Sequence, residues 1–291
     1  MDEEIIYDLC IIGAGMFGSA AARHASANVP LRVCLVGPDE PTEKERQQRE
    51  IFSSHYDEGR ITRILDDDPA CQILSRHSIS RYRELEELSG IHFHYPVGFL
   101  YIGTRNSQIM NKMVQVAATC DVPTVDLHRD EIFQMSSMPS IVCRRDLENT
   151  GLNLGAYILP PIRYPDGNYY LKIGHMDMVN CDIKTLPEVK HWYLSKGDER
   201  VIEMYSKLLI EMLPGLEVEG LSSMTCVTCE SPSGLPYIDQ VSPTVTVAVV
   251  GNGKGAKFSD EVGRIAAHLS ITGKWDSELA KSQFKVILAE S

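Results

Sequence analysis

A glycine-rich turn near the start of the chain has the spacing that binds the phosphates of a dinucleotide. It follows an apolar, strand-like run at 5–12 and precedes a helix-like run at 19–25 and a second strand-like run at 31–36. The first glycine makes the tight turn, the second lets a pyrophosphate approach the backbone, and the third lets the helix pack on the strand. The alternative is a glycine turn with only a structural role. The residues predicted to bind the dinucleotide are Gly13, Ala14, Gly15, Met16, Phe17 and Gly18.

The acidic residue that usually follows the second strand and binds the ribose hydroxyls is missing. Gly37 and Pro38 occupy its place, and Asp39 and Glu40 come just after them. Either carboxylate is a candidate for the ribose contact, and the alternative is a weaker contact. No arginine is present there to indicate a 2′-phosphate.

A second glycine-rich turn lies near the other end of the chain. A β-branched run at 244–250 leads into this turn, in which Gly253 and Gly255 are candidate cofactor contacts. Ser259 is the predicted N-cap of the next helix because two acidic residues follow it, and Gly273 is predicted to end that segment. A nucleotide-binding domain built from both chain ends, with a second domain inserted, is typical of flavoproteins.

The middle of the chain reads as a mixture of helices and strands. Apolar spacing predicts a helix over 69–88, and 93–102 reads as strand, turn and strand. Pro160 and Pro161 are interpreted as a turn. Helices are also predicted at 109–118 and 201–213, and strands at 141–143, 156–159 and 169–174. The predicted fold is therefore α/β: a Rossmann-like domain from 1–90 and 221–291, and an α+β substrate domain from 91–220 with a mostly antiparallel sheet.

Composition excludes several classes of function. The 291 residues include 40 acidic and 28 basic ones, a net charge of −12, which argues against nucleic-acid binding. No apolar run of about 20 residues is present, so no membrane span is predicted. The acidic N-terminus and the lack of a peroxisomal C-terminal signal lead us to expect a cytoplasmic protein. Eight scattered cysteines fit a reducing compartment, and the single Cys-x-x-Cys lacks partner ligands, so no metal site is predicted.

Five motifs in order resemble the monomeric sarcosine oxidase family, also called N-methyl amino acid oxidases, within the D-amino-acid oxidase group of FAD enzymes. The resemblance covers most of the chain. Besides the first glycine turn, the motifs are the 59–63 loop, Tyr169-Tyr170-Leu171-Lys172-Ile173-Gly174-His175, the 224–228 segment, and Gly253 to Ser259. The resemblance implies an enzyme, expected to be a monomer, that oxidises the C–N bond of a secondary or tertiary amino acid. Sarcosine-like and cyclic amines are the implied substrates, dioxygen is the oxidant, and an imine and H2O2 are the products.

The resemblance also implies roles for the matching residues. Arg63 and Lys257 match two cations that hold the substrate carboxylate, which suits a planar guanidinium and an ammonium group. Tyr170 matches a tyrosine of the substrate cavity. Lys172 matches the lysine beside the flavin where dioxygen is reduced, and His175 is a looser match to an active-site histidine.

Two further residues match positions near the flavin. Arg60 matches an arginine beside the ring, and Cys226 matches the cysteine that carries FAD through a covalent thioether in several members. Other interpretations stay open. The two arginines are also suited to solvated ion pairs with Asp57, Glu58 or the 66–68 run, and strand alternation alone places Lys172 on an exposed face. Cys226 is also interpretable as a plain strand cysteine or a redox partner of Cys229.

The chain is shorter than members of this family. The match runs in step to about Phe133 and resumes near Met138. The missing stretch normally returns to the nucleotide domain and supplies a strand and an adenosine contact. Without it, a sheet is left with unpaired backbone groups. The alternative prediction is therefore a shortened relative that is non-catalytic or deficient in flavin.

Overall fold

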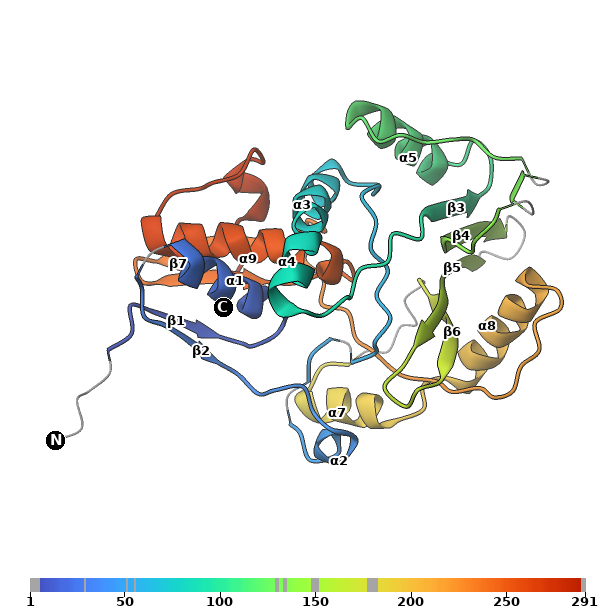
Figure 1. Cartoon of the computed structure of the whole chain (residues 1–291), viewed down its shortest axis with the longest axis horizontal. Helices are drawn as coiled ribbons and strands as arrows, with labels where there is room; N and C mark the ends of the chain where they lie inside the picture. The colour runs from blue at the N-terminus through green and yellow to red at the C-terminus, as the bar shows by residue number, and fades with distance from the viewer. Residues whose placement is uncertain are drawn as a thin grey trace. The chain divides into compact units, whose positions relative to one another are not determined.

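The computed structural model describes residues 6–288 except 29, 51, 55, 129–130, 133–134, 148–151 and 177–182. The chain divides into two compact units (Figure 1). Unit 1 comprises Met1–Glu43, Asp68–His94 and Thr228–Ser291, and unit 2 comprises Lys44–Asp67 and Tyr95–Val227. Both glycine-rich turns belong to unit 1. No helix in the described ranges has the length and apolar character needed to cross a bilayer.

Unit 1 contains two small sheets and the longest helix. β1 and β2 pair in parallel, with Leu9 opposite Val33, and β7 and β8 pair in an antiparallel hairpin. Its elements are β1 (Leu9–Ile12), α1 (Met16–Asn28), β2 (Val33–Val36), α3 (Pro69–Ser80), α4 (Tyr82–Ser89), β7 (Tyr237–Ser242), β8 (Val245–Val249), α9 (Gly255–Thr272) and the 3-10 helix η1 (Lys281–Phe284).

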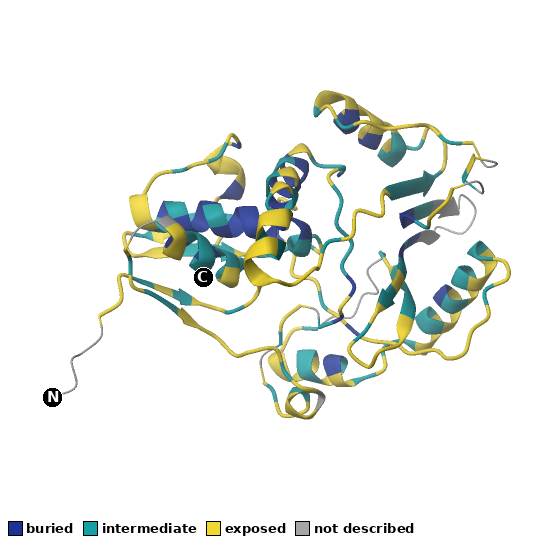
Figure 2. Ribbon diagram, in the orientation of Figure 1, coloured by how far each residue is buried: buried dark blue, intermediate teal, exposed yellow. Residues whose placement is uncertain are grey.

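The core of unit 1 forms around α9. Phe258, Val262, Ile265 and Leu269 recur at helical spacing along it and have no exposed surface. The helix packs against α1 and α3, and Figure 2 shows buried residues along much of its length. Gly263 permits the close approach of α1, because a Cβ there would lie 2.5 Å from the Cβ of Ala20.

Two expectations for unit 1 are wrong. Ser259 is not an N-cap: α9 begins at Gly255, and the buried Ser259 hydroxyl donates to the Ala256 carbonyl at 3.0 Å. The helix begins earlier because the turn before it, not a polar side chain, sets its direction. The expected helix over 69–88 also breaks into α3 and α4 at Arg81. Gly273 does end α9, in the left-handed conformation.

Unit 2 is built on a four-stranded sheet with the order β3-β4-β5-β6. β3 and β4 are parallel, and the other two pairings are antiparallel. The elements are α2 (Glu43–Arg46) at the boundary between units, β3 (Phe99–Gly103), α5 (Gln108–Thr119), β4 (Ser140–Leu147), β5 (Leu152–Arg163), β6 (Tyr169–His175), α7 (Leu186–Leu194) and α8 (Glu199–Met212).

The sheet of unit 2 corrects two further expectations. The strand–turn–strand over 93–102 contains a single strand, β3. Pro160 and Pro161 do not end a strand; β5 runs through them, with a register shift between Leu159 and Ile162. Proline has no N–H to donate to a ladder, so the pairing with β6 is interrupted and resumes beyond it. Lys172 lies opposite Leu159, at the edge of this irregularity.

Candidate active site

The first glycine-rich turn has the geometry of a phosphate-binding site. Gly13 has a φ of +110°, and a Cβ on Gly18 would lie 1.7 Å from the Gly13 carbonyl oxygen. A Cβ on Gly15 would meet nothing within 4 Å, so the backbone there faces open space beside the N-terminus of α1. Ser19 closes the turn by donating to the Ala14 carbonyl at 3.0 Å. The residues present therefore fit the pyrophosphate of a dinucleotide such as FAD.

The chain after β2 packs directly on this turn. A Cβ on Gly37 would lie 2.4 Å from the Ala14 nitrogen. Any side chain at this position would disturb the turn, which explains why the usual acidic residue is absent there. Asp39 and Glu40 follow in the chain and remain the predicted ribose contacts.

The second glycine-rich turn lies next to the first. Val250, Asn252 and Gly253 all have positive φ, which redirects the chain from β8 into α9. The Asn252 side chain accepts from the Ser231 amide at 2.8 Å and holds this unusual path. A Cβ on Gly255 would lie 3.5 Å from the ring of Phe17, so the N-terminal ends of α1 and α9 are neighbours within unit 1.

Lys257 is buried near the start of α9. The residue is 4% exposed, and its carbonyl accepts from the Tyr82 hydroxyl at 3.3 Å. A cation in the first turn of a helix opposes the helix dipole, so helix stability does not explain it. Lys257 belongs to unit 1 and Arg63 to unit 2, so their shared role in holding a carboxylate stays a prediction.

Arg63 is held by groups of unit 2. Its guanidinium lies over the Phe99 ring at 4.8 Å, its Nε donates to the Leu65 carbonyl at 2.9 Å, and it pairs with Asp66 at 3.8 Å. Asp66 has no exposed surface, so this ion pair is not the solvated one considered from the sequence. Burial lowers the pKa of Arg63, and the neighbouring Asp66 opposes that change.

Lys172 is buried in a polar cluster of unit 2. Its side chain is 15% exposed; its Nζ donates to the Asp57 carboxylate and, at 3.0 Å, to the Gly59 carbonyl. It also lies over the Tyr157 ring at 5.6 Å. The interpretation of Lys172 as an exposed strand residue is therefore wrong. Burial lowers the pKa of Lys172, and the charge of Asp57 opposes the shift.

Asp57 and Tyr164 complete this cluster, and neither was predicted as a site residue. Tyr164 donates to the Asp57 carboxylate at 2.5 Å. Desolvation and this hydrogen bond raise the pKa of Tyr164, and desolvation raises the pKa of Tyr157 to about 12. A single acidic residue in a polar loop gives little signal in the sequence, because its partners lie more than 100 residues away along the chain.

Arg60 and Cys226 act electrostatically on the same cluster. Burial raises the pKa of the Cys226 thiol, while the positive charges of Lys172 and Arg60 act to lower it. The carbonyl of Cys226 accepts from the indole of Trp192 at 3.0 Å, which fixes this segment against α7. Cys226 and Cys229 are both free.

Tyr170 and His175 lie on β6 on either side of Lys172. The Tyr170 hydroxyl donates to Asp166 at 2.7 Å, and this bond lowers the pKa of Asp166. His175 ends the strand, with its ring 5.6 Å from that of Tyr205. The structure therefore gathers Arg60, Lys172 and Cys226, while Tyr170 and His175 have separate partners and their predicted roles stay predictions.

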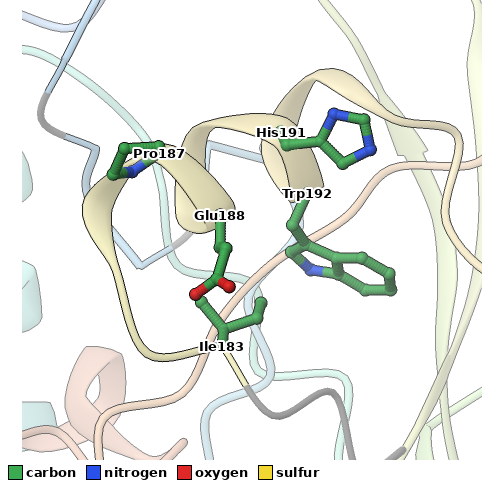
Figure 3. Close-up of a pocket in the computed structure, with 5 residues that line it drawn as sticks. All are labelled: Ile183, Pro187, Glu188, His191 and Trp192. Atoms are coloured by element: carbon green, nitrogen blue, oxygen red, sulfur yellow. The ribbon is translucent and has the colours of Figure 1, made fainter.

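A separate pocket lies at the start of α7, as Figure 3 shows. It has a volume of about 360 Å³ and is lined by Ile183, Pro187, Glu188, His191 and Trp192. None of the predicted site residues lines it. Trp192 links it to them, because the Trp192 indole donates to the Cys226 carbonyl.

Comparison with known proteins gives a family match over part of the chain and a fold over nearly all of it. Residues 8–144 match the family model described as DAO, FAD dependent oxidoreductase. No curated protein matches the sequence significantly.

Several solved structures match along nearly their whole length, each at low sequence identity. A variant of NikD, an unusual amino acid oxidase essential for nikkomycin biosynthesis, matches with a TM-score of 0.66 and 12% identity over 98% of this chain and 99% of that one. L-proline dehydrogenase from P. horikoshii matches with a TM-score of 0.64 and 12% identity over 96% of each chain. Iminodiacetate oxidase from Chelativorans sp. BNC1 matches with a TM-score of 0.53 and 13% identity over 95% of this chain and 98% of that one. Residues 8–144 are thus similar to the DAO family of FAD-dependent oxidoreductases, and the chain has the mixed α/β fold of solved amino acid oxidases.

Proposed function

We propose that the protein oxidises the C–N bond of a small secondary or tertiary amino acid, acting as a monomer in the cytoplasm. A secondary amine loses a hydride and a proton to become an imine, and a tertiary amine loses a hydride to become an iminium ion. Dioxygen gains the hydride and a proton to become H2O2, and water later hydrolyses the imine or iminium. The family supports an FAD-dependent oxidoreductase. The substrate and the oxidant are the parts that we propose.

FAD, when bound, takes two electrons from the amine and passes them to dioxygen. The chain itself supplies binding and charge. The open backbone at Gly15 and the N-terminus of α1 present N–H groups to the pyrophosphate. Arg63, with its planar donors, is the proposed anchor of the substrate carboxylate.

The observation that carries the proposal is the partly buried cation of Lys172, held on the Asp57 carboxylate. It sits on the antiparallel part of the sheet in unit 2, and Cys226 and Arg60 are near enough to act on its charge. A fixed positive charge stabilises the negative charge that develops as dioxygen is reduced. A lysine with only a structural role on the surface of the sheet would not need an ion pair with a buried carboxylate.

The structural neighbours favour amino acids with secondary amines. By their names, two of them act on proline and iminodiacetate, and both compounds are secondary amines that carry a carboxylate. Such a substrate suits an arginine anchor and a site for C–N oxidation. We therefore propose sarcosine, pipecolate and proline as the compounds to test first.

The experiment measures peroxide release from the flavin-loaded protein with each of these three amines. We expect Lys172→Met to lower the rate by about 100-fold or more, as removal of a preorganised electrostatic group does. Lys207→Met is the matched control, because Lys207 is exposed on α8 and pairs only with Glu203 among the contacts found for its ammonium group. Equal rates in the two variants, or no peroxide from any of these amines, would contradict the proposal.

A second candidate function is favoured by the sheet of unit 1. Within the described residues β1 pairs only with β2, and Ile12, Leu35 and Val36 are 88%, 41% and 50% exposed. Exposed apolar strands are expected if a covering segment is missing, as in a shortened relative with weak flavin affinity. Purified protein that carries stoichiometric flavin, measured by visible absorbance, would exclude this candidate.

A further inference from the structure

Among the described residues, two side chains from different parts of the chain donate to the Asp57 carboxylate. Tyr164, just after β5, donates to its Oδ1, and Lys172 on β6 donates to its Oδ2. Asp57 is 8% exposed, so its charge is largely removed from water. A buried carboxylate needs compensating donors, and here one of the two is the lysine of the proposed oxidase site.

The loop that carries Asp57 is fixed on the sheet. A Cβ on Gly59 would lie 2.9 Å from the Ile162 side chain, 3.1 Å from that of Leu159 and 3.4 Å from that of Lys172. The small residue lets the loop backbone approach β5 and β6, and its carbonyl accepts a second hydrogen bond from Lys172. The pairing of β5 with β6 is interrupted between Leu159 and Ile162, the two residues whose side chains would contact a Cβ on Gly59. Both oxygens that hold the ammonium group therefore come from one short segment.

The charges around Lys172 act in opposite directions. Burial and the positive charge of Arg60 oppose the ammonium form, whereas Asp57 favours it and the Cys226 thiolate would also favour it. The Tyr157 ring, which faces the ammonium group, is itself a very weak acid. Among the described groups that act on Lys172, Asp57 is therefore the one that carries a negative charge at neutral pH.

We propose that Asp57 is the positioning residue of Lys172, holding its ammonium group charged and in place for the reduction of dioxygen. This inference rests on the proposed function for the role of Lys172 in catalysis. The effect of Asp57 on the charge of Lys172 does not depend on that function, and it can be measured in protein without flavin.

The first test measures the pH dependence of acetylation of Lys172 in flavin-free protein, quantified by mass spectrometry of its peptide. We expect Asp57→Asn to lower the labelling midpoint by about 1–3 pH units, the usual effect of removing an opposite charge at contact distance. Glu203→Gln, which neutralises the exposed carboxylate paired with Lys207, is the matched control and should leave the Lys172 midpoint unchanged. An unchanged midpoint in Asp57→Asn would overturn the proposal.

The second test measures reoxidation by air after dithionite reduction, so that no amine substrate is involved. The pH profile of the reoxidation rate in Asp57→Asn should move down by the same amount as the labelling midpoint. If the midpoint moves and reoxidation does not, Asp57 sets the charge of Lys172 but has no role with dioxygen, and the proposal fails. If the protein binds no flavin, the proposed function fails while the labelling result still stands.

Asp57→Glu keeps the test decisive if Asp57→Asn does not fold. The longer side chain retains the charge but moves the carboxylate. Lys172 should therefore keep its labelling midpoint while reoxidation becomes slower. A midpoint that falls although the charge is retained, or reoxidation at the unchanged rate, would overturn the positioning role.

Discussion

Cys226 shows how one residue can serve either packing or cofactor attachment. Although the residue is exposed, partial desolvation raises the pKa of its thiol, so most of the thiol is protonated at neutral pH. Lys172 and Arg60 supply nearby positive charge. A cysteine that forms a thioether needs its thiolate, and these cations are what would favour it. Its carbonyl, bound by Trp192, fixes the segment independently of the thiol.

We predict that Cys226 carries the flavin covalently. Acid precipitation of the flavin-loaded protein should leave the yellow colour in the pellet, and Cys226→Ser should release all of it to the supernatant. Cys229→Ser is the matched control, because Cys229 is the other exposed free cysteine of the same Cys-x-x-Cys. Colour that stays with the pellet in Cys226→Ser would identify a different attachment.

At the scale of elements, the contact between α1 and α9 fixes the positions of both glycine-rich turns, because each turn precedes one of these helices. The two helices approach closely at Gly263, where a Cβ would lie 2.5 Å from the Ala20 Cβ and 2.6 Å from the Ala21 nitrogen. A backbone atom cannot move aside as the end of a flexible side chain can. The helices would have to separate, and the open turn at the N-terminus of α1 would move with them.

We predict that Gly263→Ala destabilises unit 1 by about 1–3 kcal/mol through overpacking and weakens flavin binding. Trp192→Phe makes Trp275 the only tryptophan, so its fluorescence during urea unfolding reports on unit 1. Gly220→Ala is a suitable control, because a Cβ there meets nothing within 4 Å. An unfolding midpoint equal to that of the control would show that α1 and α9 tolerate the extra methyl group.

Elements marked by local signals could be predicted from the sequence. The strand before Gly13, the helix after it and the end of α9 at Gly273 each depend on neighbouring residues. The start of α9 was missed because the turn before it depends on positive φ at Val250, a β-branched residue that rarely adopts this conformation. The partner of Lys172 was missed for another reason: strand alternation indicates which face a residue occupies, but not that a distant loop covers that face.

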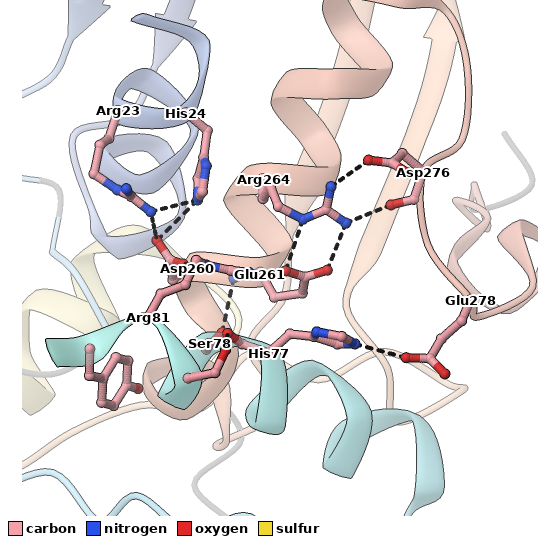
Figure 4. A network of polar contacts seen from close by, with 12 residues as sticks. Arg23, His24, His77, Ser78, Arg81, Asp260, Glu261, Arg264, Asp276 and Glu278 are labelled. Atoms are coloured by element: carbon pink, nitrogen blue, oxygen red, sulfur yellow. Dashed lines mark hydrogen bonds and ion pairs between the residues drawn. The ribbon is translucent and has the colours of Figure 1, made fainter. Parts of the chain in front are cut away.

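At the scale of the whole molecule, the two ends of the chain are joined by a network of ion pairs within unit 1 (Figure 4). Asp260 on α9 accepts from Arg23 on α1 at 2.7 Å and from Arg81 at 2.5 Å. Arg81 also reaches the nearly buried Glu261 at 2.6 Å, and Arg264 joins Glu261 to Asp276. Segments from three separate parts of the sequence are therefore joined by one network of ion pairs.

This network makes the stability of unit 1 dependent on pH. Burial acts to raise the pKa of Asp260, but hydrogen bonds from His24, Arg81 and Arg23 outweigh it and hold that pKa well below its usual value of about 3.9. Because the folded pKa is below the unfolded one, the stabilisation is complete above about pH 4 and is lost as the pH falls toward the folded pKa.

We therefore predict that unit 1 loses stability steeply below about pH 4 and that Asp260→Asn removes much of this acid dependence. At neutral pH the variant should be less stable by about 3–5 kcal/mol, because Arg23 and Arg81 each lose their ion pair with Asp260 and, among the described residues, Arg81 keeps only the one with Glu261. Both effects are measured in the Trp192→Phe background. The fluorescence of Trp275 gives the urea unfolding midpoint at pH 7, 4 and 3. Glu203→Gln, which breaks an exposed pair in unit 2, should change neither. Between pH 4 and pH 3, the urea midpoint of Asp260→Asn should fall less than that of the unchanged protein. An equal fall in both proteins would show that other groups cause the acid dependence.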